Sequence, residues 1–273
     1  MAESPFDGKR SSAASQGGEI AAQRVFGPQA GVYAASPVHA GDPSLDALRA
    51  MASPDPGVVY DWALDLGTGA GFTAFAMAGL SLQVMAIDPT LAMLQQARRI
   101  GLERKLANLA MVRSLADALP VAAASMDLVA SRMAPHHFND FEGTLDEVRR
   151  VLKPGGCLLM ADSIAPAQAG VAEWMNRIEM RRDFSHVENR QETKIEELVT
   201  ARGMILSHKE HTRIGLMFND WAARTATSEA ETQSLRRDFL NAGGAVREAF
   251  EIRPQDGDIS FSWPCLIFRA VKA

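Results

Sequence analysis

From residue 62 onward, short apolar runs alternate with longer amphipathic segments. A short apolar run bounded by turn residues predicts a buried strand, and apolar positions that recur every three to four residues predict a helix. Strands are predicted over residues 62–66, 83–87, 110–113, 127–131 and 157–162, and helices over 73–79, 91–100 and 145–152. Because a helix follows most of these strands, the pattern is typical of βαβ units and predicts a parallel sheet.

The pattern changes after residue 162. Helices are predicted over residues 171–183 and 193–202, a polar helical stretch over 219–241, and strands over 208–214 and 259–271. Pro264 interrupts the last strand. Since proline has no N–H to donate, this position is expected at a sheet edge or a bulge.

Composition narrows the class of protein. The chain has 273 residues, of which 47% are hydrophobic and 22% charged, as is ordinary for a globular protein. The net charge of -5 disfavours a nucleic-acid partner, because such binding needs clustered Lys and Arg. No apolar stretch is long enough to predict a membrane span.

The N-terminal segment and the two cysteines indicate the cellular compartment of the protein. Residues 1–18 are polar and rich in Ser, Ala and Gly, which predicts a disordered tail and not a secretory signal. Cys157 and Cys265 lie in separate apolar runs, which favours buried thiols over a disulfide. A cytoplasmic, reducing compartment is expected.

The first chemical signal is ALDLGTGAGF, residues 63–72. An apolar strand runs into Gly67, Gly69 and Gly71, and a helix follows. A Cβ at these positions would hold a ligand away from the backbone, and a tight turn there can need a positive φ. Ligands of open α/β sheets bind at the carboxyl ends of the strands, so this loop is predicted to bind one.

Two carboxylates indicate which ligand the loop takes. Dinucleotide enzymes have a third glycine where this chain has Phe72. Asp65, just before the loop, would repel a pyrophosphate but favour an ammonium or a sulfonium group. Asp88, at the end of the second predicted strand, can accept hydrogen bonds from both hydroxyls of a ribose. The alternative for Asp88 is an N-cap for the helix that begins near Leu91, and both roles could coexist.

With these residues in place, the chain resembles class I methyltransferases that depend on S-adenosylmethionine (SAM), most of all the group around the ubiquinone and menaquinone C-methyltransferases. The resemblance covers residues 59–163. It rests on LDLGTGAG, on AID at the end of the second strand, on ADALP after the third, on DLVASRMAPHHFND after the fourth and on EVRRVLKPGG before the fifth. It implies an α/β fold with a Rossmann-like, seven-stranded, mostly parallel sheet, helices on both faces and a helical cap over the acceptor site.

The expected organisation has four parts. Residues 1–18 are a disordered tail, 19–56 a helical N-terminal lid and 57–165 the SAM-binding core. Residues 166–273 are an acceptor-side helical insertion with the last strands of the sheet. No metal is expected, because His208 and His211 are three apart in a predicted strand and so face opposite sides.

Carried over residue by residue, the resemblance implies contacts with the methionine portion of SAM. Asp65, Gly67, Thr68 and Gly69 would surround it, and the backbone carbonyl of Arg132 would meet its ammonium group.

The adenosine portion has its own expected contacts. Asp88 would hold the ribose, and Met93 would pack near the adenine. Ala116 and Asp117 would recognise the adenine edge through a backbone N–H and a carboxylate. The alternative for Asp117 is a solvated loop carboxylate.

Three more side chains are implied less directly. Tyr33 and His39 would belong to a lid over SAM, or else make ordinary helix-surface contacts. His186, in the segment RRDFSHV, would line the acceptor pocket.

Methyl transfer requires placement first, and a near-attack geometry alone can lower the barrier by about 7–11 kcal/mol. A general base is needed only where the acceptor arrives protonated. His137 is the first candidate, followed by His136, with Asp162 as the carboxylate that orients a histidine or accepts a proton. Alternatively, one histidine caps the helix starting near Asn139 and the other packs against it.

The predicted function is transfer of a methyl group to an O or C atom of a small, partly apolar acceptor. An N-methyltransferase and a noncatalytic SAM-binding protein stay open as alternatives. The expected partner is a small-molecule acceptor, with no nucleic acid and no membrane span, and the protein would be a monomer or homodimer. Met and aromatic residues after residue 162 are more often core than pocket, but they could form the acceptor site: Trp174, Met175, Met180, Met217, Phe218 and Trp221.

Overall fold

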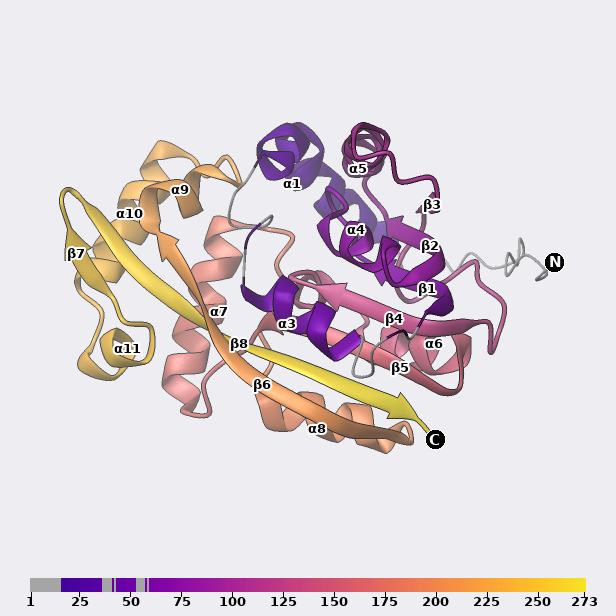
Figure 1. The fold of residues 1–273 in the computed structure, drawn as a ribbon. Coiled ribbons are helices and arrows are strands. Elements are labelled where there is room, and N and C mark those ends of the chain that lie inside the picture. The colour runs from indigo at the N-terminus through magenta and orange to yellow at the C-terminus, as the bar shows by residue number, and fades with distance from the viewer. Residues whose placement is uncertain (1–15, 36–40, 42, 53–56, 58) are drawn as a thin grey trace.

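A single mixed sheet organises the computed structural model, which describes residues 16–35, 41, 43–52, 57 and 59–273 (Figure 1). Its strands are β1 (Tyr60–Leu66), β2 (Ser81–Asp88), β3 (Leu109–Arg113), β4 (Met126–Arg132), β5 (Leu152–Ser163), β6 (Met204–Met217), β7 (Arg253–Gln255) and β8 (Asp258–Lys272). Their order is β3-β2-β1-β4-β5-β8-β6, with β7 paired to β8. The first five are parallel, and β8 is antiparallel to its neighbours. This confirms the predicted Rossmann-like fold class, to which the structure adds the short strand β7.

Helices cover the sheet. They are α1 (Gln16–Ala34), α3 (Pro43–Ala52), α4 (Phe72–Ala78), α5 (Leu91–Glu103), α6 (Phe141–Val151), α7 (Ala169–Arg182), α8 (Glu192–Ala201), α9 (Phe218–Ala223), α10 (Glu229–Leu240) and α11 (Gly244–Ala249). Helix α6 shows why they form where they do, because it buries Leu145, Val148 and Val151 on one face. The Asp140 carboxylate caps it by accepting from the Gly143 N–H at 2.7 Å. Neither neighbouring histidine is the cap, so that alternative is wrong.

The predicted polar helix over 219–241 is two helices. Helix α9 ends at Ala223, and Ser228 then starts α10 by accepting a hydrogen bond from the Glu231 N–H at 3.3 Å. A serine N-cap inside a continuous polar pattern was the available signal. Sequence reasoning also missed the short helix α11, which buries none of its residues.

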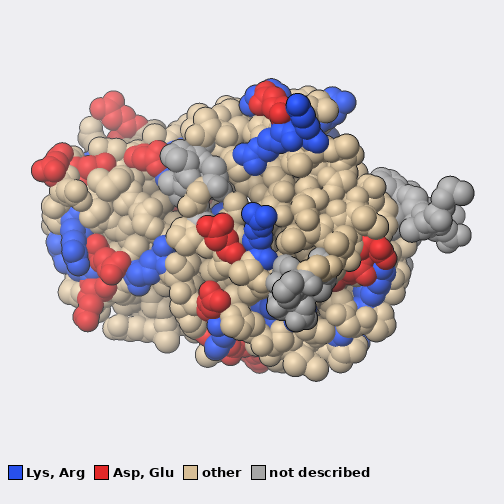
Figure 2. All heavy atoms as spheres, viewed as in Figure 1, with Lys and Arg blue, Asp and Glu red and all other residues tan. Residues whose placement is uncertain are grey.

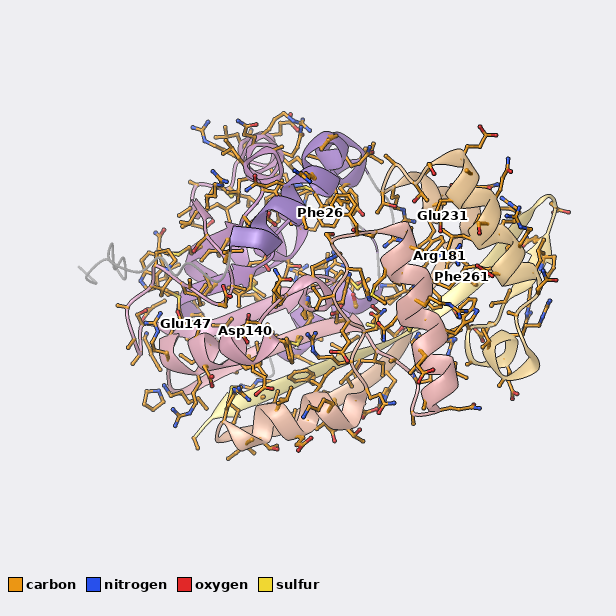
Figure 3. The ribbon with its side chains drawn as sticks, turned by 180° about the vertical axis from the view of Figure 1, so that it is seen from behind. Phe26, Asp140, Glu147, Arg181, Glu231 and Phe261 are labelled. Atoms are coloured by element: carbon orange, nitrogen blue, oxygen red, sulfur yellow. The ribbon has the colours of Figure 1, made fainter. Side chains whose placement is uncertain are left out.

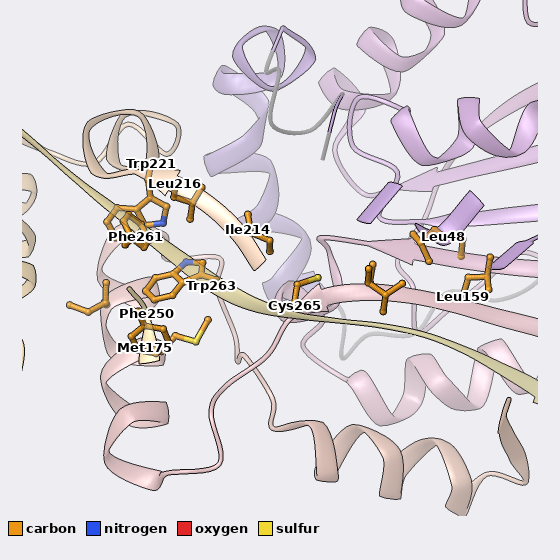
Figure 4. Close-up of a cluster of buried hydrophobic side chains, with 14 of the residues drawn as sticks. Leu48, Leu159, Met175, Ile214, Leu216, Trp221, Phe250, Phe261, Trp263 and Cys265 are labelled. Carbon is orange, nitrogen blue, oxygen red and sulfur yellow. The ribbon is translucent and has the colours of Figure 1, made fainter. Parts of the chain in front are cut away.

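Strands β6 and β8 continue past the end of β5 as a two-stranded ribbon that carries a second lobe (Figure 1). The lobe holds α9, α10, α11 and β7, and α7 packs against it. Its core is aromatic, with Trp263 in ring contact with Phe250 (centroids 4.7 Å apart) and Phe261 (4.9 Å) (Figure 4). On its outer side, Arg181 of α7 reaches α10 and donates to Glu231 at 2.7 Å (Figure 3).

Pro264 lies where β8 leaves β5. Strand β5 pairs with β8 as far as Ser163 opposite Cys265, whereas β6 pairs with β8 on to Ser260. The Pro264 carbonyl accepts from the Ile164 N–H at 2.9 Å. In an antiparallel strand the N and C=O of one residue point to the same side, so the missing N–H faces away from β6 and removes no bond from that pair. The sequence-based expectation for Pro264 is confirmed.

The surface carries charges of both signs. On the face seen in Figure 2 they are interspersed, with basic side chains gathered over α5. Among the helices of the described residues, none combines the length and apolar character needed to cross a membrane.

Candidate functional site

The glycine loop turns sharply between β1 and α4. Gly67, Gly69 and Gly71 all have positive φ, at 66°, 52° and 95°. A Cβ on Gly67 would lie 2.5 Å from the Ala134 Cβ, and one on Gly71 would lie 2.5 Å from the Phe75 ring. A Cβ on Gly69 would meet nothing within 4 Å. Two of the glycines therefore serve close packing inside the protein, whereas Gly69 leaves open space beside the cavity.

Asp88 ties this loop to the end of β2. Its Oδ2 accepts from the Gly69 N–H at 2.9 Å, and its Oδ1 accepts from the Thr90 N–H at 2.8 Å. The N-cap residue of α5 is Thr90, so Asp88 is not the cap itself. Burial raises the pKa of the Asp88 carboxyl, and the two backbone hydrogen bonds oppose that shift. Each oxygen has a further lone pair that can face a ligand in the cavity that Asp88 lines.

Asp65 lies one layer behind the cavity wall, with 1% of its surface exposed. Its Oδ2 accepts from the Thr68 hydroxyl at 2.6 Å, and its Oδ1 has no hydrogen-bond partner among the described residues. Burial raises the pKa of this carboxyl to about 7, against the opposing effects of Thr68 and Arg132. Sequence reasoning expected Asp65 to face the ligand directly, but in the structure Thr68 lines the cavity and Asp65 lies behind it.

The other wall of the cofactor end fits an adenine. Met93 is buried and lines the cavity, as do Leu115, Ala116 and Asp117. The Asp117 Oδ1 is buried and has no partner in the described part of the chain. An orphaned acceptor at this place can take the amino group of an adenine, because a buried polar atom needs a hydrogen bond. SAM therefore fits the residues present: the open space at Gly69, the Asp88 carboxylate and this acceptor.

Arg132 and the lead-in complete this end. The Arg132 side chain turns toward α3 and α4, donating to the Thr73 hydroxyl at 3.2 Å and to the Ser44 hydroxyl at 3.5 Å. Tyr33 of α1 lines the cavity. His39 lies outside the described residues, as do residues 1–15 of the expected tail.

One cavity joins the glycine loop to the second lobe. It offers about 210 Å³ to the centre of a water-sized sphere, far more than the 10–15 Å³ or so that one water needs. Its far end, called here the acceptor half, is lined by side chains from α1, the 3₁₀ turn Pro135–His137, α7, the α7–α8 loop, β6, α9 and its C-terminal end, and β8. They are Phe26, Tyr33, His136, His137, Glu179, Arg182, His186, Asn189, Ile214, Leu216, Trp221, Arg224 and Trp263.

Asp162 holds His136 at two points. Its Oδ2 accepts from the His136 backbone N–H at 2.8 Å, and its Oδ1 lies 2.6 Å from the ring Nδ1. A carboxylate only accepts, so Nδ1 carries a proton, and in the neutral form of the ring Nε2 keeps its lone pair. The Nε2 atom has no hydrogen-bond partner among the described residues. Burial lowers the pKa of His136, but the Asp162 carboxylate outweighs it together with Glu179 and Asp183, so the pKa is raised.

The other two histidines behave differently. The His137 Nδ1 lies 3.1 Å from the Ser185 carbonyl, and burial together with His136 lowers the pKa of His137 to about 4. His186 lies against Asn176 through Nε2 at 3.1 Å, and burial lowers its pKa to about 2. Phe26 of α1, labelled in Figure 3, lies against His137, with ring centroids 5.0 Å apart.

A buried charge network lies beneath the second lobe. The Glu179 Oε1 accepts from the indole N–H groups of Trp263 at 2.6 Å and Trp221 at 3.2 Å. Its Oε2 accepts from Arg182 Nε at 2.9 Å. The Arg182 guanidinium also lies over the Trp221 ring, 4.9 Å from its centroid. Both carboxylate oxygens of Glu179 are therefore used inside the protein.

Of the Met and aromatic candidates, only Trp221 lines the cavity. Trp174, Met175 and Phe218 are buried in the core, and Met180 and Met217 are exposed. The core interpretation was therefore right for three of the six.

Sequence reasoning missed Phe26, Glu179, Arg182, Asn189 and Arg224. A signal existed for two of them, since Glu179 and Arg182 lie one helical turn apart on α7.

Strand order, a glycine loop and a carboxylate at the end of β2 define a Rossmann-like enzyme with an adenosyl-cofactor site. The chain matches the family model "Methyltransferase domain" over residues 64–160. It is 31% identical over 187 residues to the uncharacterized protein YafE of Escherichia coli, which covers 68% of this chain and 90% of YafE. It is also 28% identical over 211 residues to the uncharacterized methyltransferase YcgJ of Bacillus subtilis, covering 77% of this chain and 83% of YcgJ. The crystal structure of YcgJ matches with a TM-score of 0.79 at 26% identity, covering 84% of this chain and 98% of YcgJ.

The chain therefore belongs to the class I SAM-dependent methyltransferases. It is an enzyme, and SAM is its cofactor, as the resemblance implied.

Proposed function

We propose that this methyltransferase transfers its methyl group to an O or C atom of a small, partly apolar acceptor, with His136 as the general base. The observation that supports this is the His136–Asp162 pair. Asp162 occupies the His136 Nδ1, so the His136 Nε2 is available to a ligand in the cavity. His136 follows the carboxyl end of β4, which lies next to the glycine loop. The apolar part of the acceptor would lie against Trp221, Trp263 and Ile214.

The protein's own residues would act as follows. When bound, SAM supplies the methyl group on a positively charged sulfur. His136 Nε2 takes the proton from the acceptor hydroxyl or C–H as the new bond to the methyl carbon forms. Asp162 stabilises the imidazolium that results and keeps the ring in one tautomer. Asn189 can position the acceptor, because its Oδ1 accepts from Ser163 at 2.6 Å while its Nδ2 has no partner among the described residues.

The pKa values and the pairing with Asp162 favour His136 over His137 as the base. A pKa of about 4 makes His137 a weak base at neutral pH, whereas the pKa of His136 is raised. The site roles predicted for Asp65, Gly67, Thr68, Gly69, Asp88, Met93, Ala116, Asp117 and Arg132 remain proposals of the same kind. So do a lid over SAM that includes Tyr33 and a quinone-like acceptor.

His136→Gln and His137→Gln test this proposal as a matched pair. Both are assayed with radiolabelled SAM and a small-metabolite extract, with mass spectrometry of the labelled product and calorimetry of SAM binding. His136→Gln should lose at least about 100-fold in turnover while SAM affinity stays within about twofold. His137→Gln should lose far less. Wild-type turnover in His136→Gln would remove the base from the mechanism.

The pH profile gives an independent readout. Because the pKa of His136 is raised, the base is deprotonated only above the ordinary histidine range, and turnover should rise with pH there. Asp162→Asn removes the charge that raises the pKa, so the rising limb should move to lower pH. If the rising limb of the Asp162→Asn profile stays at the wild-type pH, the His136–Asp162 pair is not the general base.

A further inference from the structure

Two buried arginines lie in the acceptor half of the cavity. Arg182 is in the last turn of α7, and Arg224 follows α9 directly. Their side chains are 10% and 9% exposed, and both line the cavity with Tyr33. Guanidinium groups are seldom buried unless they are paired, so their partners decide what they can do.

The two arginines differ in how they are neutralised. Arg182 is paired with Glu179, whose side chain is only 6% exposed, and its Nη2 also lies 4.0 Å from the fully buried carboxylate of Asp183, so its charge is matched inside the protein. Arg224 donates through Nε and Nη2 to a single oxygen of Asp220, whose side chain is 62% exposed. Water screens that surface carboxylate more than the buried guanidinium. The Arg224 Nη1 has no hydrogen-bond partner among the described residues, so a positive charge with a free donor remains at the cavity wall.

Tyr33 lines the cavity together with both arginines, and its phenol is affected by their charges. Burial raises the pKa of its phenol, Arg182 and Arg224 lower it, and Asp183 and Glu179 raise it. Tyr33, Arg182 and Arg224 line the same cavity, so a ligand in this half can meet the Tyr33 side chain from α1 and either guanidinium group.

We propose that the acceptor carries a carboxylate, which Arg224 binds beside Arg182 and Tyr33, an inference that rests on the proposed function. One guanidinium without a buried partner matches one negative charge, which favours a monoanion over a phosphate or diphosphate. Trp221, Trp263 and Ile214 beside the arginines then indicate an aromatic or otherwise apolar acid.

The test can be run on a mixture of metabolites in which the acceptor is unidentified. A small-metabolite extract is passed over an anion-exchange resin at pH 8, and the flow-through and the salt eluate are each assayed with radiolabelled SAM. Acceptor activity should bind the resin, elute with salt and survive treatment of the eluate with alkaline phosphatase. Activity in the flow-through overturns the proposal, and activity destroyed by phosphatase replaces the carboxylate with a phosphate. No labelled product in either fraction, with SAM binding intact, contradicts the proposed function itself.

A matched pair of variants assigns the carboxylate to Arg224. Arg224→Gln should raise the apparent KM for the active fraction at least tenfold, with kcat and SAM affinity little changed. Arg236→Gln is the control, because Arg236 also lies in the second lobe but contacts Asn219 and the Phe218 ring outside the cavity. Arg224→Lys keeps the charge and should recover part of the affinity, and melting temperatures show that each variant folds. An unchanged KM in folded Arg224→Gln refutes the assignment.

Discussion

The two halves of the cavity are built in different ways. The cofactor end is made from short, continuous segments, with backbone N–H groups and three glycines that follow one strand. The acceptor half is made from side chains that are far apart in sequence, such as Phe26, Glu179 and Trp263. A site built from the backbone of one loop has a local sequence signature. A site built from side chains of many separate elements has none, and its chemistry emerges only from the fold.

The largest effect is expected from adding one methyl group to the glycine loop at the cofactor end. Gly67→Ala combines a positive φ with a Cβ 2.5 Å from Ala134, so we expect a cost of about 1–3 kcal/mol from overpacking and about 1–2 kcal/mol from the backbone. The melting temperature should fall by about 5–15 °C, and SAM binding should be lost. Gly69→Ala is the control, because its Cβ meets no protein atom. It should cost only the backbone strain yet still weaken SAM binding. Equal melting temperatures for the two variants would contradict the conclusion that Gly67 serves packing whereas Gly69 does not.

The next largest effect is expected from removing the Asp88 carboxylate, which joins the glycine loop to the end of β2. Asp88→Ala loses a charged hydrogen-bond acceptor, worth about 1.5–3 kcal/mol, so SAM affinity should fall about 10- to 100-fold by calorimetry. Turnover at saturating SAM should change little. Unchanged SAM affinity would limit Asp88 to bracing the Gly69 and Thr90 amides.

A smaller effect comes from pH. The pKa of Asp65 is raised to about 7, so the group is neutral below that pH and charged above it. A positively charged ligand is attracted only to the charged form, so SAM affinity should rise about tenfold from pH 6 to pH 8. Titration of the ligand itself is removed by comparison with Asp65→Asn at each pH. The same pH dependence in both proteins would show that Asp65 does not contribute.

The smallest effect concerns the acceptor half and requires no substitution. His137 has a pKa of about 4 and should stay neutral from pH 5.5 to 8.5, while His136 should titrate above the ordinary histidine range. Ring proton shifts measured by NMR across this window distinguish the two. A His137 signal that titrates near pH 6.5 would reverse the choice of base.

These contrasts explain what the sequence could predict. The five parallel strands, the fold class and the cofactor were predictable, because apolar runs and the glycine loop are local patterns. The helices of the second lobe were predicted in part, since a polar stretch does not show where one helix ends. Asp65 shows a limit of another kind, because its spacing was right but its place behind the cavity wall that Thr68 lines could be seen only in three dimensions.

The remaining unpredicted features have a common physical origin. Glu179 and Arg182 look like an ordinary surface ion pair in sequence, and only the two indole N–H groups from α9 and β8 make them a buried network. Arg224 is a candidate for binding an anion because its partner Asp220 is exposed to solvent, and the exposure of that carboxylate could not be predicted from the sequence pattern.

The ribbon of β6 and β8 determines how the second lobe is joined to the rest of the chain. Met217 and Ser260 are paired across it, so the chain enters and leaves the lobe at adjacent points. A graft of the intervening segment between related chains would leave the glycine loop untouched and would exchange Trp221 and Arg224 of the acceptor half. We expect such a graft to change the choice of acceptor while the affinity for SAM carries over.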